Sequence, residues 1–390
     1  MPDLAPVVAV IGGGQLARMM AEPAAALGIP LRLLAEAEGV SAAQVIADTV
    51  VGDYRELALL QEVTRGAAVV TFDHEHVPTE HLHALEASGL AVRPGPEALV
   101  HAQDKAVMRE RLTGLGMPCP RWAVLQGPEE VEAFGLPCVL KTTRGGYDGH
   151  GVWVVRELDQ AQEAFAHAAR SGVRVLAEEL VDFRRELAAL VARSPSGQAA
   201  AYPVVASTQV DGICAEVVAP APDLAPELAT HAQQIALTIA KELDVVGVLA
   251  VELFETRDGR VLVNELAMRP HNTGHWSQDG AVTSQFENHL RAVLDLPLGS
   301  PAPRAPWTVM VNILGAPDRA DGSHVGRLYD GYPHALARDP RLRVHLYGKD
   351  LRPGRKVGHV NAYGDDLEDC LERARHAAAW FRGDLGNESE

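Results

Sequence analysis

Residues 248–266 constrain the fold of this chain more than any other segment, because two apolar, strand-like runs are joined there by Asp258-Gly259. Asp-Gly favours a two-residue type I′ turn, which closes a β-hairpin. Glu252 lies six residues before Asp258, and Glu265 lies six residues after Gly259. The sequence therefore predicts that these two carboxylates face each other across an antiparallel pair of strands.

Two glutamates placed opposite each other repel, and the pair is destabilising unless a positive charge lies between them. Magnesium suits such a pair, since it takes oxygen ligands from one or two carboxylates and completes its shell with water and nucleotide phosphates. The alternative is a pair of exposed glutamates on a solvated face. Cations beside metal-binding acids are typical of phosphoryl transfer, and polar residues at this strand end favour the magnesium site. They are Asn264, Arg269, His271, Asn272 and His275.

Composition narrows the classes of protein to consider. The 390 residues are 47% hydrophobic and 22% charged, which is typical of a globular protein with more than one lobe. A net charge of −17 disfavours a nucleic-acid partner and requires a local basic pocket for any anionic ligand. The first apolar run breaks at Gly12, so we expect no export signal, no membrane span and a cytoplasmic location. The cysteines show no CxxC spacing and are expected to be reduced; they are Cys119, Cys138, Cys214 and Cys370.

The patterns along the chain predict an α/β protein with three domains. Strands at 7–11, 31–34 and 68–72 alternate with helical patterns such as 15–27, which indicates a doubly wound, Rossmann-like domain over residues 1–100. Residues 101–300 form the second predicted domain, with an α+β lid at about 119–180. A small third domain spans 301–390 and is expected to end in a helix at about 367–381.

The glycine-rich turn after the first strand allows a competing interpretation. Gly12-x-Gly14-x-x-Ala17 is typical of a turn that places a helix N-terminus against a pyrophosphate, and Glu36 ends the next strand, where a ribose-binding acid belongs. An NAD-binding oxidoreductase is therefore one hypothesis. A tight turn without a ligand is the other, because this motif alone is a weak signal.

Two further segments favour a nucleotide site in the second domain. Lys141 precedes a glycine-rich loop at 145–151 whose backbone N–H groups could close over phosphates, although the segment could also be a simple hairpin tip. A lysine buried without an anion is costly, which favours phosphate contact. Downstream, the backbone at 178–181 is a candidate to contact adenine, and Glu186 a candidate to accept ribose hydroxyls.

Taken together, these residues resemble the ATP-grasp superfamily, and within it the 5-(carboxyamino)imidazole ribonucleotide synthase family. The resemblance runs almost end to end. The most specific motifs are Gly-Gly-Tyr-Asp-Gly at 145–149, Arg-Pro-His-Asn-Thr-Gly-His-Trp at 269–276 and Arg-Pro-Gly-Arg-Lys-Val-Gly-His at 352–359. Further matching motifs lie at 12–19, 71–78, 103–105 and 264–267. The chain departs from the family pattern at Ala17, Met268 and Gln209.

The resemblance implies an ATP-grasp fold that binds ATP and Mg²⁺, with Glu252 and Glu265 as the metal ligands. It assigns ATP binding to a set of residues in the second domain. They are Lys105, Lys141, Gly145, Gly146, Tyr147, Asp148, Gly149, His150, Gly151, Glu178, Glu179, Leu180, Val181, Glu186, Gln209, Asn264 and Glu265.

The resemblance also implies the reaction, the carboxylation of aminoimidazole ribonucleotide by bicarbonate through carboxyphosphate, and a homodimer. The relatives that compete are formate-dependent glycinamide ribonucleotide transformylases, and a non-catalytic nucleotide sensor is a candidate from another class. Bicarbonate and the reacting centre are assigned to Arg269, His271, Lys349, Tyr147 and Asp148. The ribonucleotide is assigned to Gln15, Leu16, Glu75, Asn272, Lys349, Arg355 and Lys356.

Overall fold

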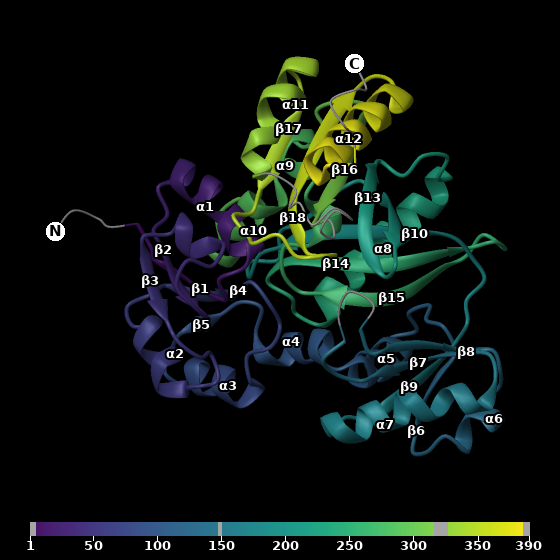
Figure 1. Ribbon diagram of the computed structural model, residues 1–390. Coiled ribbons are helices and arrows are strands. Elements are labelled where there is room, and N and C mark those ends of the chain that lie inside the picture. Colours follow the sequence, from purple (N-terminus) through teal and green to yellow (C-terminus); the bar gives the residue numbers. More distant parts are fainter. Residues whose placement is uncertain (1–4, 147–149, 316–326, 385–390) are drawn as a thin grey trace.

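The computed structural model describes residues 5–146, 150–315 and 327–384 (Figure 1). Its N-terminal lobe is a parallel sheet with the strand order β3-β2-β1-β4-β5. The strands are β1 (Val8–Ile11), β2 (Leu31–Ala35), β3 (Asp48–Val51), β4 (Val69–Phe72) and β5 (Ala91–Val92). The helices are α1 (Gln15–Leu27), η1 (Ala42–Gln44), α2 (Leu57–Val63), α3 (Thr79–Ala87) and α4 (Pro96–Gln103).

Strand β1 shows why this lobe is doubly wound. Successive side chains of a strand point to opposite faces. Val8 and Val10 pack in the cluster that contains α1, whereas Ala9 and Ile11 pack in the cluster that contains α2 and α3. A strand buried on both faces reads as a continuous apolar run, which the sequence has at 7–11. The predicted helix at 15–27 is confirmed, while the short strands β3 and β5 were not foreseen.

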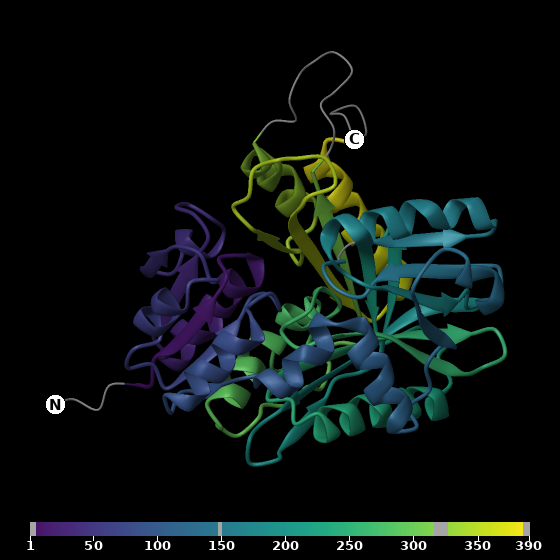
Figure 2. The ribbon, with the colours of Figure 1, turned by 90° about the horizontal axis from the view of Figure 1, so that it is seen from below.

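Helix α5 (Lys105–Gly114) leads from this lobe into the lid, which we define as the antiparallel sheet β6-β9-β7-β8 and its helices. In Figures 1 and 2, α4 and α5 lie between the N-terminal lobe and the lid. The lid has its own core, because one face of α7 packs against the sheet. The buried residues on that face are Ala161, Ala164 and Ala168. The lid elements are β6 (Trp122–Leu125), α6 (Glu130–Phe134), β7 (Cys138–Thr142), β8 (Val152–Val155), η2 (Leu158–Gln160), α7 (Ala161–Ser171) and β9 (Val175–Glu179).

The central sheet is antiparallel and has the order β15-β14-β10-β12-β13-β16-β18-β17, with β11 beside β10. Its first strands are β10 (Phe183–Arg193), β11 (Ala199–Ala201), β12 (Val205–Val210), β13 (Ile213–Ala219), β14 (Gly247–Thr256) and β15 (Val261–Ala267). The helical segments between them and the C-terminal strands are α8 (Pro226–Glu242), η3 (Asn272–Gly274), α9 (Ser277–Gly280) and α10 (Gln285–Val293). Packing of α10 against both α1 and β14 joins this sheet to the N-terminal lobe.

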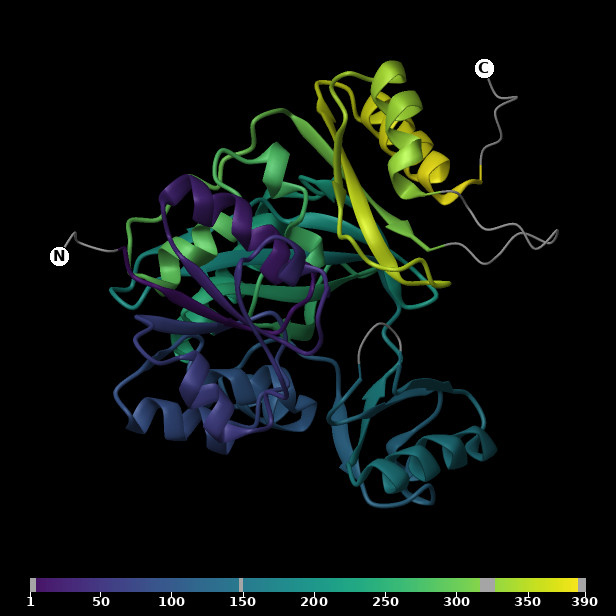
Figure 3. The ribbon, with the colours of Figure 1, turned by 60° about the vertical axis from the view of Figure 1, so that its left-hand side comes forward.

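The C-terminal strands continue the same sheet, because β16 pairs with β13. Figure 3 shows the C-terminal helices on the side of this sheet away from the lid. The elements are β16 (Trp307–Leu314), η4 (Leu328–Gly331), α11 (Tyr332–Arg338), β17 (Arg343–Leu346), β18 (Lys356–Gly364) and α12 (Leu367–Arg382). The predicted boundary near residue 300 therefore falls between strands of one sheet, and the domain limits stay a prediction.

Candidate active site

Glu252 and Glu265 are direct partners across β14 and β15, as the sequence predicts. The predicted two-residue turn, however, is wrong. Thr256 N–H donates to the Arg260 carbonyl (2.9 Å), so three residues form the loop. Gly259 has a positive φ (81°), whereas Asp258 does not. A type I′ turn needs positive φ at both positions. The Thr256 hydroxyl also accepts the Arg260 N–H (2.9 Å), which stabilises the longer loop.

A β-bulge compensates for the longer turn. Leu253 pairs with Val263, while Glu252 pairs with Glu265, so Asn264 is the extra residue on β15. A bulge of one residue moves all later positions by one and turns every side chain to the other face of the sheet. The two carboxylates therefore meet because the turn and the bulge shift the register in opposite directions.

The environments of the two carboxylates differ. Lys105 Nζ lies 2.5 Å from Oε1 of Glu265, and although burial acts to raise the pKa of this carboxyl, the lysine holds it below its usual value. Burial and the neighbouring Glu265 raise the pKa of Glu252, whose Oε1 lies 3.4 Å from His271 Nε2.

Among the described residues, no cluster of three or more histidine, cysteine or acidic residues is arranged for a metal. A pair of carboxylates fits magnesium that takes its other ligands from phosphates and water.

Lys141 reaches this pair from the lid. Its Nζ lies 2.7 Å from Oε2 of Glu178 and donates to Oδ1 of Asn264 (3.1 Å), so strand β7 of the lid contacts the bulge of β15. Burial acts to raise the pKa of Glu178, but Lys141 and Arg109 lower it to about 2. The Glu178 side chain is therefore an ion-pair partner, and its backbone lies in a strand paired on both sides, so the adenine contact at 178–181 stays a prediction.

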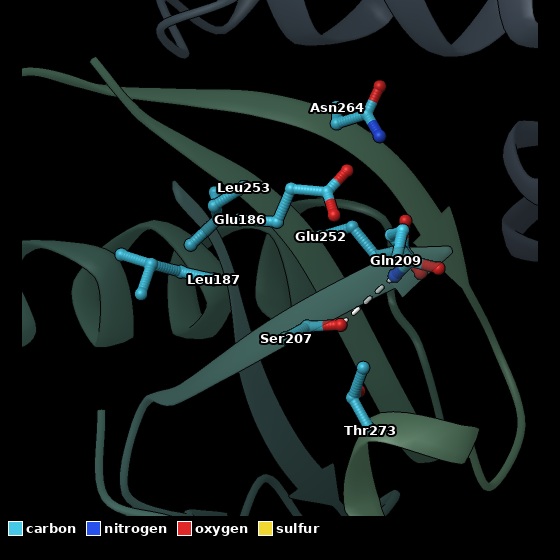
Figure 4. A pocket seen from close by; sticks show the side chains of 8 residues that line it. All are labelled: Glu186, Leu187, Ser207, Gln209, Glu252, Leu253, Asn264 and Thr273. Carbon is cyan, nitrogen blue, oxygen red and sulfur yellow. Dashed lines mark hydrogen bonds between the residues drawn. The ribbon is translucent and has the colours of Figure 1, made fainter. Parts of the chain in front are cut away.

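Side chains from β10, β12, β14, β15 and η3 converge on one pocket (Figure 4). Glu186 lies in it, and burial raises the pKa of this carboxyl to about 7. Gln209 donates from Nε2 to the Ser207 hydroxyl (3.0 Å). The lining residues are Glu186, Leu187, Ser207, Gln209, Glu252, Leu253, Asn264 and Thr273.

The glycine-rich loop is described in part, since Tyr147, Asp148 and Gly149 lie outside the described residues. Gly145 and Gly151 have positive φ, and a Cβ on Gly151 would lie 2.6 Å from Oγ1 of Thr142. His150 is exposed. At the other end of the lid, Glu179 Oε1 accepts the Arg121 N–H (3.0 Å), and Leu180 and Val181 are half-buried.

Residues predicted to hold the ribonucleotide come together from distant parts of the chain. Lys349 Nζ donates to Oε1 of Gln15 (2.6 Å), and Arg269 Nε donates to Oε2 of Glu75 (2.8 Å). The side-chain amide of Asn272 is buried and has no nitrogen or oxygen partner among the described residues, while the thiol of Cys214 hydrogen-bonds it.

The structure also places four other predicted site residues. The Leu16 side chain is buried in the core beside α10, which leaves its backbone for any ligand contact. Arg355 and Lys356 lie half-buried where β18 begins. Burial and the charge of Arg269 hold the pKa of His271 well below its usual value, so this histidine is neutral.

Three N–H groups of the glycine turn are already bound by carboxylates of this chain. Gly13 N–H donates to Oε2 of Glu36 (3.0 Å), and Asp73 accepts from the N–H groups of Gly14 (3.1 Å) and Ala17 (2.7 Å). These carboxylates fill the positions that a pyrophosphate would need. The structure therefore disfavours the NAD interpretation, and it gives Glu36 the role of closing the turn.

Sequence reasoning missed two groups of residues that organise the site. Arg109, fully buried on α5, binds Glu178 and two main-chain carbonyls of β15. Ser41 and Gln44 donate to the carbonyls of Tyr347 (2.6 Å) and Gly348 (2.6 Å), which fastens the segment beside Lys349 to the N-terminal lobe. Sequence reasoning could have found Arg109 from its spacing, because it lies one helical turn after Lys105.

Comparisons with known proteins agree with this geometry. The model of the ATP-grasp domain matches residues 110–286, the model of the ribonucleotide synthetase preATP-grasp domain matches residues 6–103, and that of the phosphoribosylaminoimidazole carboxylase C-terminal domain matches residues 308–373. The fold and the site are those of an ATP-grasp ligase.

Similar proteins define the family more closely. The N5-carboxyaminoimidazole ribonucleotide synthase of Mycobacterium bovis is 56% identical over 97% of this chain and 88% of its own length. The chain belongs to the N5-carboxyaminoimidazole ribonucleotide synthase family. Among solved structures, the synthetase from Thermus thermophilus has a TM-score of 0.83 at 37% identity, covering 98% of this chain and 100% of that one. The Aspergillus clavatus enzyme in complex with ADP and aminoimidazole ribonucleotide has a TM-score of 0.87 at 30% identity, covering 97% and 99%.

Proposed function

We propose that this chain uses ATP and bicarbonate to carboxylate 5-aminoimidazole ribonucleotide on its exocyclic amine, in purine biosynthesis, with release of ADP and phosphate. The observation that carries the proposal is the Glu252 and Glu265 pair, held beside Lys105 and Lys141 on the side of the site that the lid covers. An Aspergillus clavatus relative in complex with ADP and the same ribonucleotide supports the choice of substrate.

The nucleotide would lie between the lid and the central sheet. Lys141 would contact phosphate, the backbone at 178–181 would contact adenine, and Glu186 would accept the ribose hydroxyls. Glu252 and Glu265 would hold Mg²⁺, which when bound neutralises charge on the transferring phosphoryl group. Lys105 would keep Glu265 charged and oriented before the nucleotide arrives.

The acceptor half of the reaction would use residues that follow β15, next to the carboxylate pair. Arg269 and His271 would orient bicarbonate, whose oxygen attacks the γ-phosphorus and expels ADP to give carboxyphosphate. The amine of the ribonucleotide then bonds to the carboxyl carbon and loses a proton. If carboxyphosphate is attacked, phosphate leaves in this step; if carbon dioxide is attacked, phosphate has already left when carboxyphosphate broke down. Tyr147 and Asp148 are proposed to close over this centre from the lid, which would exclude water.

The 5′-phosphate of the ribonucleotide needs local positive charge in a chain whose net charge is −17. Lys349, Arg355 and Lys356 supply it from the C-terminal segment. Gln15 and Asn272 would hydrogen-bond the sugar and base. Glu75 would act through its ion pair with Arg269, which links the ribonucleotide side of the site to the bicarbonate side.

ADP release is the experiment that separates this proposal from its alternatives. Turnover should require bicarbonate together with aminoimidazole ribonucleotide. Turnover with formate and glycinamide ribonucleotide would instead indicate a transformylase, and nucleotide binding without turnover would indicate a sensor. Tight NAD binding would instead favour an NAD-binding oxidoreductase.

We also propose a homodimer and a cytoplasmic location, as in the sequence-based expectation. Light scattering of the purified chain measures the mass in solution and tests the first, and cell fractionation tests the second. Within the described residues, no helix is both long enough and apolar enough to cross a membrane.

A further inference from the structure

Arg109 is fully buried on α5, between the lid and the central sheet. Its guanidinium donates to three oxygen acceptors on two other elements, and NH1 also donates to Sγ of Cys119 (3.8 Å). Nε donates to Oε1 of Glu178 on β9 (2.6 Å), NH1 donates to the carbonyl of Val263 (2.8 Å), and NH2 donates to the carbonyl of Asn264 (2.7 Å). A planar fork of N–H donors can satisfy such a set, whereas the compact ammonium of lysine cannot.

The first branch of this network leads to the phosphate-binding lysine. Glu178 accepts from Arg109 through one oxygen and lies 2.7 Å from Lys141 Nζ through the other. Lys141 in turn donates to Asn264. Without Arg109, Glu178 would be a buried carboxylate with one partner fewer, and it would no longer be fixed in the position that holds Lys141.

The second branch leads to the metal-binding pair. Val263 and Asn264 lie at the bulge, where the ladder between β14 and β15 is interrupted. Strand β15 ends the sheet order, so its outer backbone groups have no neighbouring strand. Arg109 satisfies the two carbonyls, and the Pro118 carbonyl accepts the Val263 N–H (2.7 Å). These contacts fix the bulge that brings Glu265 opposite Glu252.

We propose that Arg109 is a positioning residue for nucleotide binding, which couples the lid to the bulge at Asn264 and thereby holds Lys141 and Glu265 in their binding geometry. The inference rests on the proposed function for its choice of substrates. Its direct test, however, is the binding of Mg²⁺ and ADP to the full chain, and this measurement needs neither bicarbonate nor the ribonucleotide.

Calorimetric titration of Mg²⁺ and ADP should show at least about a tenfold weaker Kd in Arg109→Lys than in the unaltered chain. In steady-state assays the KM for ATP should rise by a similar factor, while the KM for the ribonucleotide changes by less than about twofold. Glu178→Gln should weaken Mg²⁺ and ADP in the same way. The double variant should bind no worse than the weaker single variant, because the two side chains act in one network.

Arg373→Lys is the matched control, since the Arg373 side chain is only 10% exposed, binds Asp339 through Nε (2.6 Å) and donates to the Tyr363 carbonyl (3.3 Å) far from the site. It should lower Tm and leave the Kd unchanged. Arg109→Lys would overturn the proposal if it lowered Tm as much as the control does and still bound Mg²⁺ and ADP with the original Kd. Absence of ribonucleotide-dependent turnover in the unaltered chain would contradict the proposed function alone, because nucleotide binding would still report on Arg109.

Discussion

Lys349 donates a 2.6 Å hydrogen bond from Nζ to Oε1 of Gln15, although the two residues lie 334 positions apart. The contact exists because Ser41 and Gln44 hold the backbone at Tyr347 and Gly348 against the N-terminal lobe. The proposed ribonucleotide site therefore needs residues from both ends of the chain, whereas the proposed nucleotide site uses residues from its middle.

This arrangement predicts that the two substrates respond separately to substitution. Lys349→Met should raise the KM for aminoimidazole ribonucleotide by at least about tenfold, since a charge-assisted contact to its phosphate is lost. The KM for ATP should change by less than about twofold. Steady-state kinetics with each substrate varied in turn measures both. Arg352→Met removes an exposed cation of the same segment and should change neither; a comparable effect there would mean that general charge, and not Lys349, attracts the ribonucleotide.

The metal assignment predicts a specific magnesium requirement. Glu265→Gln keeps the size of the side chain but removes a proposed ligand and the partner of Lys105. The magnesium concentration for half-maximal activity should rise, and kcat should fall by about a hundredfold or more. Asp258→Asn, at the exposed end of the same hairpin, is the control for hairpin stability. Unchanged magnesium dependence in Glu265→Gln would remove this residue from the metal site.

The raised pKa of Glu186, about 7, predicts how stability depends on pH. An unfolded glutamate has a pKa of about 4.3, so between these values the folded chain holds a proton that the unfolded chain has released. The contribution of this group to the free energy of unfolding is therefore complete below about pH 4.3 and is lost as pH rises through about 7.

Glutamine resembles the protonated carboxyl, and so the Tm of Glu186→Gln should exceed that of the unaltered chain by a margin that grows from about pH 5 to about pH 8. Thermal unfolding without nucleotide or magnesium measures this margin. Glu242→Gln, at an exposed position, should show no such trend. A margin that shrinks with rising pH would mean that the pKa is not raised.

Gly151 and Gly172 allow a controlled test of the glycine-rich loop. Both have positive φ, so alanine costs about 1 kcal/mol at either position. A Cβ at Gly151 would also lie 2.6 Å from Thr142 Oγ1, whereas Gly172 has open space around it. Gly151→Ala should raise the KM for ATP by roughly fivefold or more, and Gly172→Ala should leave it unchanged. Equal ATP kinetics in the two variants would exclude a role for this loop in nucleotide binding.

Local patterns were sufficient for much of the fold. The helix at 15–27 has the predicted bounds, and the strands predicted at 7–11, 31–34 and 68–72 each differ by one residue from β1, β2 and β4, because each is a continuous apolar or periodic run between glycine, proline or turn residues. The facing of Glu252 and Glu265 was predicted correctly from an incorrect turn. The bulge at Asn264 was not predictable, since Arg109 and Pro118, which satisfy its backbone groups, come from a distant helix and the segment after it.

The sequence by itself determined which chemistry this chain carries: paired carboxylates, a lysine before a glycine-rich loop, and cations at the end of an acidic chain. Those features are local, and they depend on spacing and residue type alone. Only the tertiary structure decided which groups are partners. Glu178 binds Lys141 and Arg109, Glu36 closes the glycine turn, and Lys349 meets Gln15. Such pairings depend on how three sheets pack, because a buried charge is tolerated only where the fold brings a partner to it.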